Sequence, residues 1–341
     1  MSARQRFVTT LFSLFLTGMI GTVYAQDFPS STSAETTKIV FHNAADLPSV
    51  LEHVGSARIV KLRAFVTDEG QVDTVRQAVA DAFRARQSLP AMTVVRVGRL
   101  PGGVPVSWES IAESSQTANA QGLAFISGQA ASAPDPETPL ASMAEKSRAA
   151  LRSCLRASDA RSEDVVRVTC LMSSLADLDA VKRVMEAEFT QAAFGYIQLE
   201  KTPSRAVIEC EAVARLRSAP SQPLLMVHPS DLEQSPNYSH VALVGSPNVA
   251  FTSAHLAKGE DAASARAAFE ELRDSLQEAG ASIGRVAMSS LYPTSPKASK
   301  LISDTRFDFY DRANPPASTL MNFEGLPGGS VFAVDVVAPI E

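Results

Sequence analysis

The chain has 341 residues, of which 45% are hydrophobic and 20% are charged. This composition is typical of soluble globular proteins and excludes disordered and fibrous classes. The formal net charge is −6, and no basic stripe runs along the sequence. Because nucleic-acid affinity comes largely from Lys and Arg that displace phosphate counterions, the composition argues against nucleic acid as a partner.

The first residues predict a cleaved export signal. Arg4 and Arg6 form a basic start, residues 7–20 form an apolar run, and Val-Tyr-Ala at 23–25 is a small-residue cleavage site. The apolar run is shorter than the roughly 20 residues that span a bilayer. We therefore expect residues 1–25 to be removed and the protein to be secreted or periplasmic, with no membrane attachment afterwards.

The segment that follows divides into a leader and a first set of elements. Residues 26–37 are rich in Ser and Thr and are expected to form a flexible leader. The elements predicted within residues 38–116 are, in chain order, a strand (38–42), a short helix (46–54), a strand (59–66), a helix (71–85) and two strands (93–98 and 105–112). The helix over 71–85 has its apolar residues at the spacing of a core-facing stripe.

Two further sets of elements follow, separated by a Pro- and Ser-rich linker at 219–237. Those predicted within residues 117–218 are a strand (123–127), a helix (141–157), a strand (165–172), a helix (178–189) and two strands (196–199 and 206–214). Those predicted within residues 238–341 are a strand (249–253), a helix (262–279), a strand (286–292), a helix ending at 310 and a terminal hairpin around 326–329.

One segment occurs three times. Arg58–Asp68, Asp164–Ser174 and Gly284–Thr294 superpose without a gap, at a spacing typical of a small domain. The chain therefore carries three copies of one domain, which we call repeats one (38–116), two (117–218) and three (238–341). Repeat one is truncated, because the residues before it are too few for a full front half.

Strands that alternate with amphipathic helices predict an α+β fold with helices on one face of each sheet. The strands offer apolar side chains to both faces, so the second face must also be covered. Three repeats that pack around a pseudo-threefold axis would supply that cover, and the protein would then be a monomer with the architecture of a trimer.

The three cysteines, Cys154, Cys170 and Cys210, all lie in repeat two and lack metal-ligand spacing, so no zinc site is expected. Two interpretations remain open. The favoured one is that all three are buried small apolar side chains. The other is one disulfide with one free thiol, formed in an oxidising compartment.

Several motifs appear in order and then recur at the repeat spacing. The runs at 125–129 (Phe-Ile-Ser-Gly-Gln), 162–171 and 206–214 resemble the Rid family, also called the YjgF or reactive intermediate deaminase family. The resemblance extends from about residue 56 to the end. It implies a chorismate-mutase-like fold, ligand clefts between subunits, and hydrolysis of imines and enamines without a cofactor or metal.

The resemblance also predicts which functional residues are missing. In the family an arginine grips the substrate carboxylate, nine residues before the proline of a Leu-Pro turn. The same count in the three repeats ends at Met92, Phe194 and Ser318. The missing charged hydrogen bond is worth about 1.5–3 kcal/mol, so ordinary carboxylate-anchored hydrolysis is not expected.

The family glutamate survives once. Its positions here are Ser107, Glu209 and Ala333. The Ser-Gly-Gln run also survives once, at residues 127–129, whereas repeat three has Ser-Ala-His at 253–255 and repeat one lacks the segment. The predicted site therefore has Glu209 as its catalytic residue, either a proton donor or a group that orients water, with the following substrate-binding residues: Ser127, Gly128, Gln129, Phe194 and Arg205.

Three residues have alternative interpretations: Glu209, Arg205 and His255. Glu209 would otherwise be a strand carboxylate that faces solvent or a neighbouring arginine, and Arg205 an ordinary surface arginine. His255 would be a general base or a structural histidine.

At the level of the whole chain we expect an exported protein that binds a small imine, keto acid or amino acid in an inter-repeat cleft, with residual or altered hydrolase activity. The alternative is a catalytically inactive scaffold or partner-binding module. A nuclease role, ascribed to some relatives, is disfavoured by the acidic charge.

Overall fold

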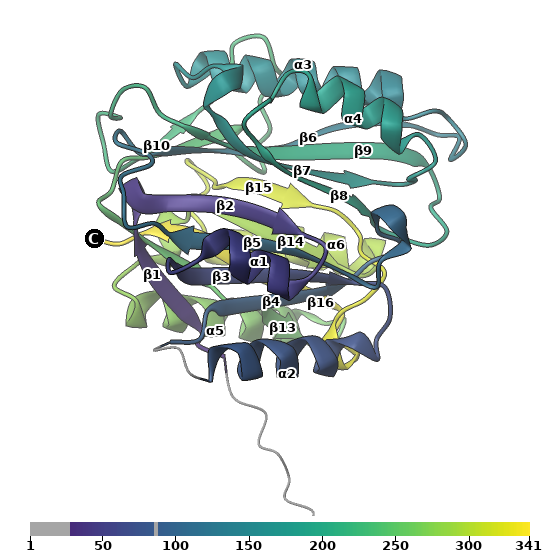
Figure 1. The fold of residues 1–341 in the computed structure, drawn as a ribbon, viewed down its shortest axis with the longest axis horizontal. Coiled ribbons are helices and arrows are strands. Elements are labelled where there is room, and N and C mark those ends of the chain that lie inside the picture. Colours follow the sequence, from purple (N-terminus) through teal and green to yellow (C-terminus); the bar gives the residue numbers. More distant parts are fainter. Residues whose placement is uncertain (1–27, 85–87) are drawn as a thin grey trace, which may run out of the picture.

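The computed structural model describes residues 28–84 and 88–341, so the predicted export signal lies outside the described residues. Three β-sheets face a common centre and the helices lie on the outside (Figure 1). The sheet of repeat one has four strands, in the order β2 (Ile39–Ala44), β5 (Val106–Glu113), β3 (Arg58–Val66) and β4 (Ala91–Arg96), with α1 (Leu47–Val54) and α2 (Gln71–Phe83). None of the described helices is long and apolar enough to cross a membrane.

The other two sheets have six strands each. The sheet of repeat two has the order β10 (Leu224–Val227), β11 (Val241–Val244), β6 (Leu123–Ala133), β9 (Ala206–Arg215), β7 (Val165–Met172) and β8 (Ala193–Gln198), with α3 (Ala141–Ala157) and α4 (Leu178–Glu186). The path through the sheet of repeat three is β1 (Ser31–Glu35), β12 (Asn248–Thr252), β16 (Phe332–Pro339), β14 (Met288–Pro293) and β15 (Ala317–Leu320). There β13 (His255–Ala257) pairs with β16, and the helices are α5 (Ala262–Glu278) and α6 (Pro296–Thr305).

The strand pairings confirm the repeat and correct its third alignment. In every repeat a strand pairs in parallel with the next strand and antiparallel with the last one. The residues facing the last strand at equivalent places are Arg63, Thr169 and Ser290. The third segment is therefore Arg285–Ser295 and not Gly284–Thr294. The gap-free superposition was one residue out, which would have placed every side chain on the wrong face.

The first strands are exchanged between repeats, which corrects the predicted leader and linker. Residues 31–35 are not flexible but form β1, which pairs with β12 of repeat three over five residues. The predicted linker contains β10, which pairs with β11, and β11 pairs with β6 of repeat two. Edge strands need partners, and here the partners lie in another repeat. The N-terminal strand thus closes the ring of sheets onto the last repeat.

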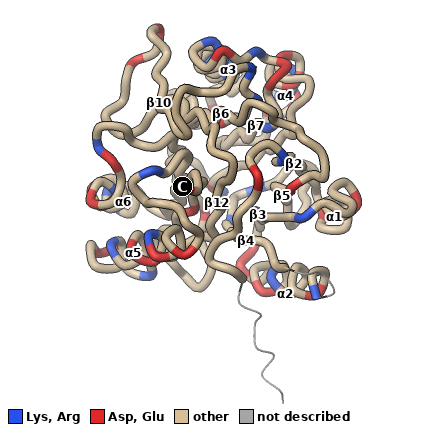
Figure 2. The backbone as a smooth tube through the Cα atoms, turned by 90° about the vertical axis from the view of Figure 1, so that its left-hand side faces the viewer, with Lys and Arg blue, Asp and Glu red and all other residues tan. Residues whose placement is uncertain are grey.

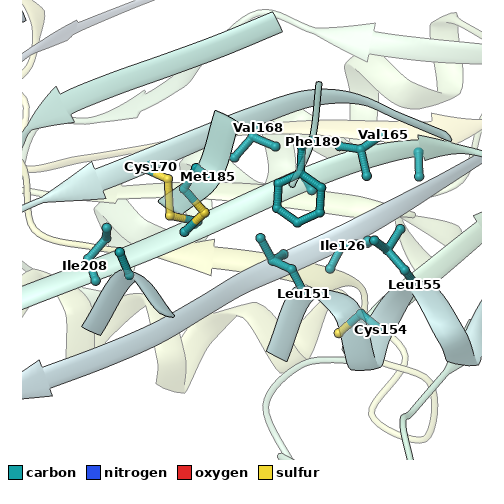
Figure 3. Packing of buried hydrophobic residues seen from close by; sticks show 14 of the residues in the cluster. Ile126, Leu151, Cys154, Leu155, Val165, Val168, Cys170, Met185, Phe189 and Ile208 are labelled. Atoms are coloured by element: carbon teal, nitrogen blue, oxygen red, sulfur yellow. A yellow bond between two sulfur atoms is a disulfide. The ribbon is translucent and has the colours of Figure 1, made fainter. Parts of the chain in front are cut away.

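Each repeat has an outer core between its sheet and its helices. In repeat two, Leu151 and Leu155 of α3 pack with Phe189 against the sheet (Figure 3). Cys170 and Cys210 are directly paired across β7 and β9 and form a disulfide in this core, with their Cα atoms 4.1 Å apart. Cys154 is a buried free thiol. The favoured interpretation of three free cysteines was therefore wrong, and the alternative of one disulfide plus one thiol is the arrangement observed.

The inner faces of the three sheets form a second core with a charged layer inside it. One aromatic residue from each repeat, at equivalent positions, contributes to the inner core: Phe41, Phe125 and Phe251. A second apolar layer contains Phe65, Leu171 and Tyr292. Between them lies a charged layer of six buried side chains: Lys61, Arg63, Arg167, Glu109, Glu211 and Asp335. Other charged residues mostly follow the outer helices and loops (Figure 2).

Ion pairs in the charged layer lie both within and between repeats. Arg63 Nη1 lies 3.0 Å from Glu109 Oε2, and Arg63 Nη2 lies 3.4 Å from Asp335 Oδ1. Lys61 Nζ donates to Asp335 Oδ2 at 3.0 Å, and Arg167 donates to Glu211. Asp335 thus joins repeat three to both cations of repeat one.

Replacing Arg63 with Met should destabilise the protein by about 3–5 kcal/mol, because Glu109 would keep a buried charge without its nearest cation and Asp335 would keep only Lys61. The matched control is Arg58→Met on the same strand, whose side chain is 43% exposed in its pair with Glu113. An exposed pair is worth at most about 1 kcal/mol. Urea unfolding of both variants checks this, and equal losses of stability would contradict the role given to the charged layer.

Candidate functional site

The structure brings Ser127, Gly128 and Glu209 together where repeat two meets β15 of repeat three. Ser127 Oγ donates to Ser239 O at 2.6 Å and accepts from Ser318 N at 2.8 Å. Gly128 N donates to Thr319 Oγ1 at 3.2 Å. The residues that resemble the family site are therefore framed by repeats two and three.

A local irregularity in β6 shapes this contact. The pairing of β6 with β9 is interrupted between Ile126 and Gln129, which leaves Ser127 and Gly128 unpaired in the ladder. A Cβ atom on Gly128 would lie 1.9 Å from Glu209 Oε1. Only glycine allows the chain to pass this close to the carboxyl group.

Glu209 is 7% exposed and does not face solvent. Burial raises its pKa to about 8, and the nearby negative charge of Glu211 acts in the same direction. Arg205 and a hydrogen bond from the main chain of Leu320 oppose the shift. A carboxyl group with this pKa carries a proton at neutral pH and is suited to donate it.

Arg205 lines a cavity of about 390 Å³ between repeats two and three. The other polar residues of its wall include Glu200, Ser299 and Asn322. Arg205 is exposed, and among the described residues no hydrogen bond or salt bridge engages its guanidinium. Val207 also lines the cavity. Because side chains alternate along a strand, Val207 and Glu209 share one face of β9, with Arg205 at the cavity immediately before the strand.

Two predicted site residues have other roles in the structure. Phe194 lies on β8, where its ring stacks on Tyr196 at 5.8 Å and packs against the core of repeat two. It does not reach Glu209. Gln129 is buried and donates through Nε2 to Ser127 O at 2.9 Å, so it supports the irregular segment instead of facing the cavity.

The counterparts in the other repeats lack this site. Repeat one does have the segment that we expected it to lack. Asn43 and Ala44 of β2 pair regularly with Glu109 and Trp108, without the irregularity. His255 of repeat three is 8% exposed, and burial together with the charge of Lys61 lowers its pKa to about 4. It is therefore a neutral, structural histidine.

Three residues that precede β11 in the chain lie near the site and were not predicted from the sequence: His228, Tyr238 and His240. His240 O accepts from Ser127 N at 2.9 Å. Its ring lies 5.5 Å from those of both Tyr238 and His228. Burial and the charge of Glu209 raise the pKa of Tyr238. The available signal was the pair of apolar runs at 224–227 and 241–244, which is typical of a hairpin and was interpreted as a linker and a domain start.

Among the described residues, no group of three or more His, Cys, Asp or Glu side chains is placed to hold a metal ion.

Residues 5–114 and 107–218 each match the family described as endoribonuclease L-PSP. The chain belongs to this family. Its two successive matches make it a tandem Rid-family protein, and the strand order of the third sheet shows a further copy of the fold. No curated protein matches the chain.

Several solved structures are similar to single repeats. The Rid-family protein YyfB of Yersinia pestis is 19% identical and covers 35% of this chain and 100% of its own, with a TM-score of 0.32. RidA from an Antarctic Psychrobacter species is 18% identical and covers 27% of this chain and 80% of its own, with a TM-score of 0.25. A YjgF-family protein of Neisseria meningitidis is 15% identical over 32% of this chain and 91% of its own, with a TM-score of 0.26.

The raised pKa of Glu209 predicts how stability depends on pH. The folded state holds this proton up to a pH of about 8, whereas the unfolded chain loses it above about 4.5. The contribution to stability is therefore fully present below pH 4.5 and is lost progressively as pH rises to about 8. Glu209→Gln cannot titrate and should be more stable than the wild type at pH 9 but not at pH 5. Unfolding midpoints across this range check the prediction. The control is Glu163→Gln, at an exposed carboxylate. A Glu209→Gln protein whose stability follows that of the wild type at every pH would contradict the prediction.

Proposed function

We propose that the protein binds a small carboxylate-bearing metabolite, an imine, keto acid or amino acid, in the cleft between repeats two and three. The observation that carries the proposal is the pairing of an unengaged cation with a buried acid. Arg205 lines the cavity immediately before β9, and Glu209 lies four residues further along the chain, within β9. A guanidinium can grip a carboxylate through two hydrogen bonds.

The cation comes from a different place than in the family. Repeats one and three keep the Leu-Pro-Gly-Gly turn, with Gly103 and Gly329 at φ of 69° and 68°. Repeat two has Arg205 at the equivalent position, two residues after the turn proline. Arg205 therefore replaces, from the turn, the charge that Met92, Phe194 and Ser318 do not supply.

Glu209 supplies the chemical step of this proposal, the hydrolysis of an imine. A protonated Glu209 gives its proton to the imine nitrogen, which makes the carbon electrophilic. Water adds to that carbon and returns a proton to Glu209, which then protonates the amine nitrogen of the adduct. As the carbon–nitrogen bond breaks, the hydroxyl proton passes back to Glu209, and a keto acid and ammonia leave. The substrate carboxylate stays on Arg205, so the reacting bond is held beneath the acid.

The second candidate function is an inactive scaffold or partner-binding module. It is favoured by the loss of the family arginine from all three repeats, since binding of an anion then depends on a single exposed side chain. The two functions differ in whether any small molecule binds or turns over in the cleft.

Arg205→Met should weaken binding of pyruvate, 2-oxobutyrate or alanine at least tenfold, because a charged hydrogen bond is worth about 1.5–3 kcal/mol. Arg161→Met, at a side chain that is 68% exposed, is the control. Calorimetry measures binding, and release of ammonia from freshly generated iminopropionate measures turnover. Glu209→Gln should abolish turnover while binding remains. If none of these compounds binds or reacts, the scaffold function is favoured.

We further propose that the protein is exported. The basic and apolar start of the chain supports this, and so does the Cys170–Cys210 disulfide, because disulfides persist in oxidising compartments. Amino-terminal sequencing of the protein recovered from the periplasm or medium should begin at Gln26. Recovery from the cytoplasm with Met1 or Ser2 at the start would contradict export.

A further inference from the structure

A small cavity lies between the inner aromatic residues and the charged layer. Its volume is about 30 Å³, above the roughly 10–15 Å³ that a cavity needs to hold one water molecule. Its apolar wall includes one residue from each repeat: Phe41, Phe125 and Phe251. Its charged wall consists of Lys61, Arg63, Arg167, Glu109 and Asp335. The cavity is therefore enclosed by all three repeats and belongs to none of the clefts between them.

The acceptors in this wall already have donors. Asp335 Oδ1 accepts from Arg63, and Asp335 Oδ2 accepts from Lys61, Thr93 and Tyr292. Glu109 Oε2 accepts from Arg63, and Glu109 Oε1 accepts from Thr169. Both carboxylates thus direct their oxygens to donors of the protein.

The donors are not all used. Lys61 donates to Thr93, to Thr252 O and to Asp335, which uses its three N–H groups. In contrast, the Nε atoms of Arg63 and Arg167 are buried and have no hydrogen-bond partner. The side chain of Arg167 is only 8% exposed and that of Arg63 11%. A buried donor without a partner costs about 1–3 kcal/mol, and these two donors belong to residues that line the same cavity.

The net charge of the wall is positive, which also favours a ligand that accepts hydrogen bonds and carries negative charge. Three cations and two carboxylates line the cavity, and the third carboxylate, Glu211, lines a separate small cavity together with Arg63. The local field therefore favours a negative occupant, even though the six side chains balance over the whole layer.

We propose that this cavity binds one halide-sized anion, chloride under ordinary conditions, held by the Nε–H groups of Arg63 and Arg167. A halide only accepts hydrogen bonds, which matches two Nε–H donors, whereas a water molecule would also donate, to Glu109, Ser110 or Ser290. Water is therefore the competing occupant that the crystal experiment below distinguishes. Because the binding groups come from repeats one and two and the aromatic wall from all three, the ion stabilises the assembled ring.

Crystals of the whole protein grown with bromide in place of chloride test the site directly. An anomalous peak between the guanidinium groups of Arg63 and Arg167 is expected. A peak absent there, with water-like density in its place, would overturn the proposal.

Melting temperature in solution provides the second test. Sodium chloride at about 150 mM should raise the melting temperature by about 2–4 °C over sodium gluconate at the same ionic strength, because gluconate is too large to enter. Equal melting temperatures in the two salts would contradict a bound halide, since general screening is the same in both.

Arg167→Lys keeps the charge and removes the Nε–H group, so the difference between chloride and gluconate should fall by at least half. Arg217→Lys, at a surface arginine paired with Glu163 and Asp164, should keep the full difference. An Arg167→Lys protein with an unchanged chloride effect would overturn the assignment of Arg167. If that variant does not fold, the bromide peak in the wild type decides.

Discussion

The charged layer at the centre constrains the whole molecule. Each repeat supplies one carboxylate at the same position of its last strand, as Glu109, Glu211 and Asp335. The cations are distributed unequally, since repeat one supplies two, repeat two one and repeat three none. Buried charges are tolerated only when they are paired, so the layer balances with one copy of each repeat. Three copies of repeat one would bring six cations against three carboxylates.

This constraint explains why the inter-repeat clefts have diverged. Once the repeats are not interchangeable, each cleft can change alone. The cavity between repeats one and two, of about 470 Å³, has Gly103 and Leu178 where the cavity of about 390 Å³ has Arg205 and Ser299. The cation in the wall of the larger cavity is Arg99, which lies before the turn, and Leu175 and Leu178 make the facing wall apolar. The candidate site is consequently a property of one cleft, and a symmetric trimer could not carry it in this form.

The sequence predicted the parts of the fold that depend on local pattern. The helix over 141–157 and the strand over 165–172 have their predicted bounds, because a long amphipathic stripe and a continuous apolar run are local signals. Ser127, Gly128 and Glu209 were also brought together as expected. The pairing of β1 with β12 was not predicted, because its partner lies more than two hundred residues away. The packing of Phe194 against the core of repeat two was not predicted either. Its position in the sequence motif does not show which face of the sheet its side chain occupies.

The turn of repeat two shows how a structural feature became a candidate functional one. In repeats one and three, both turn glycines adopt positive φ, a conformation that costs any other residue energy. Arginine at position 205 therefore required a different turn, and the described residues include no positive φ at Ser204 or Arg205. The altered turn leads directly into β9, where Val207, which lines the cavity with Arg205, shares one face of the strand with Glu209. The presence of Arg205 at the second turn-glycine position therefore both alters the turn and adds a cation near the buried Glu209.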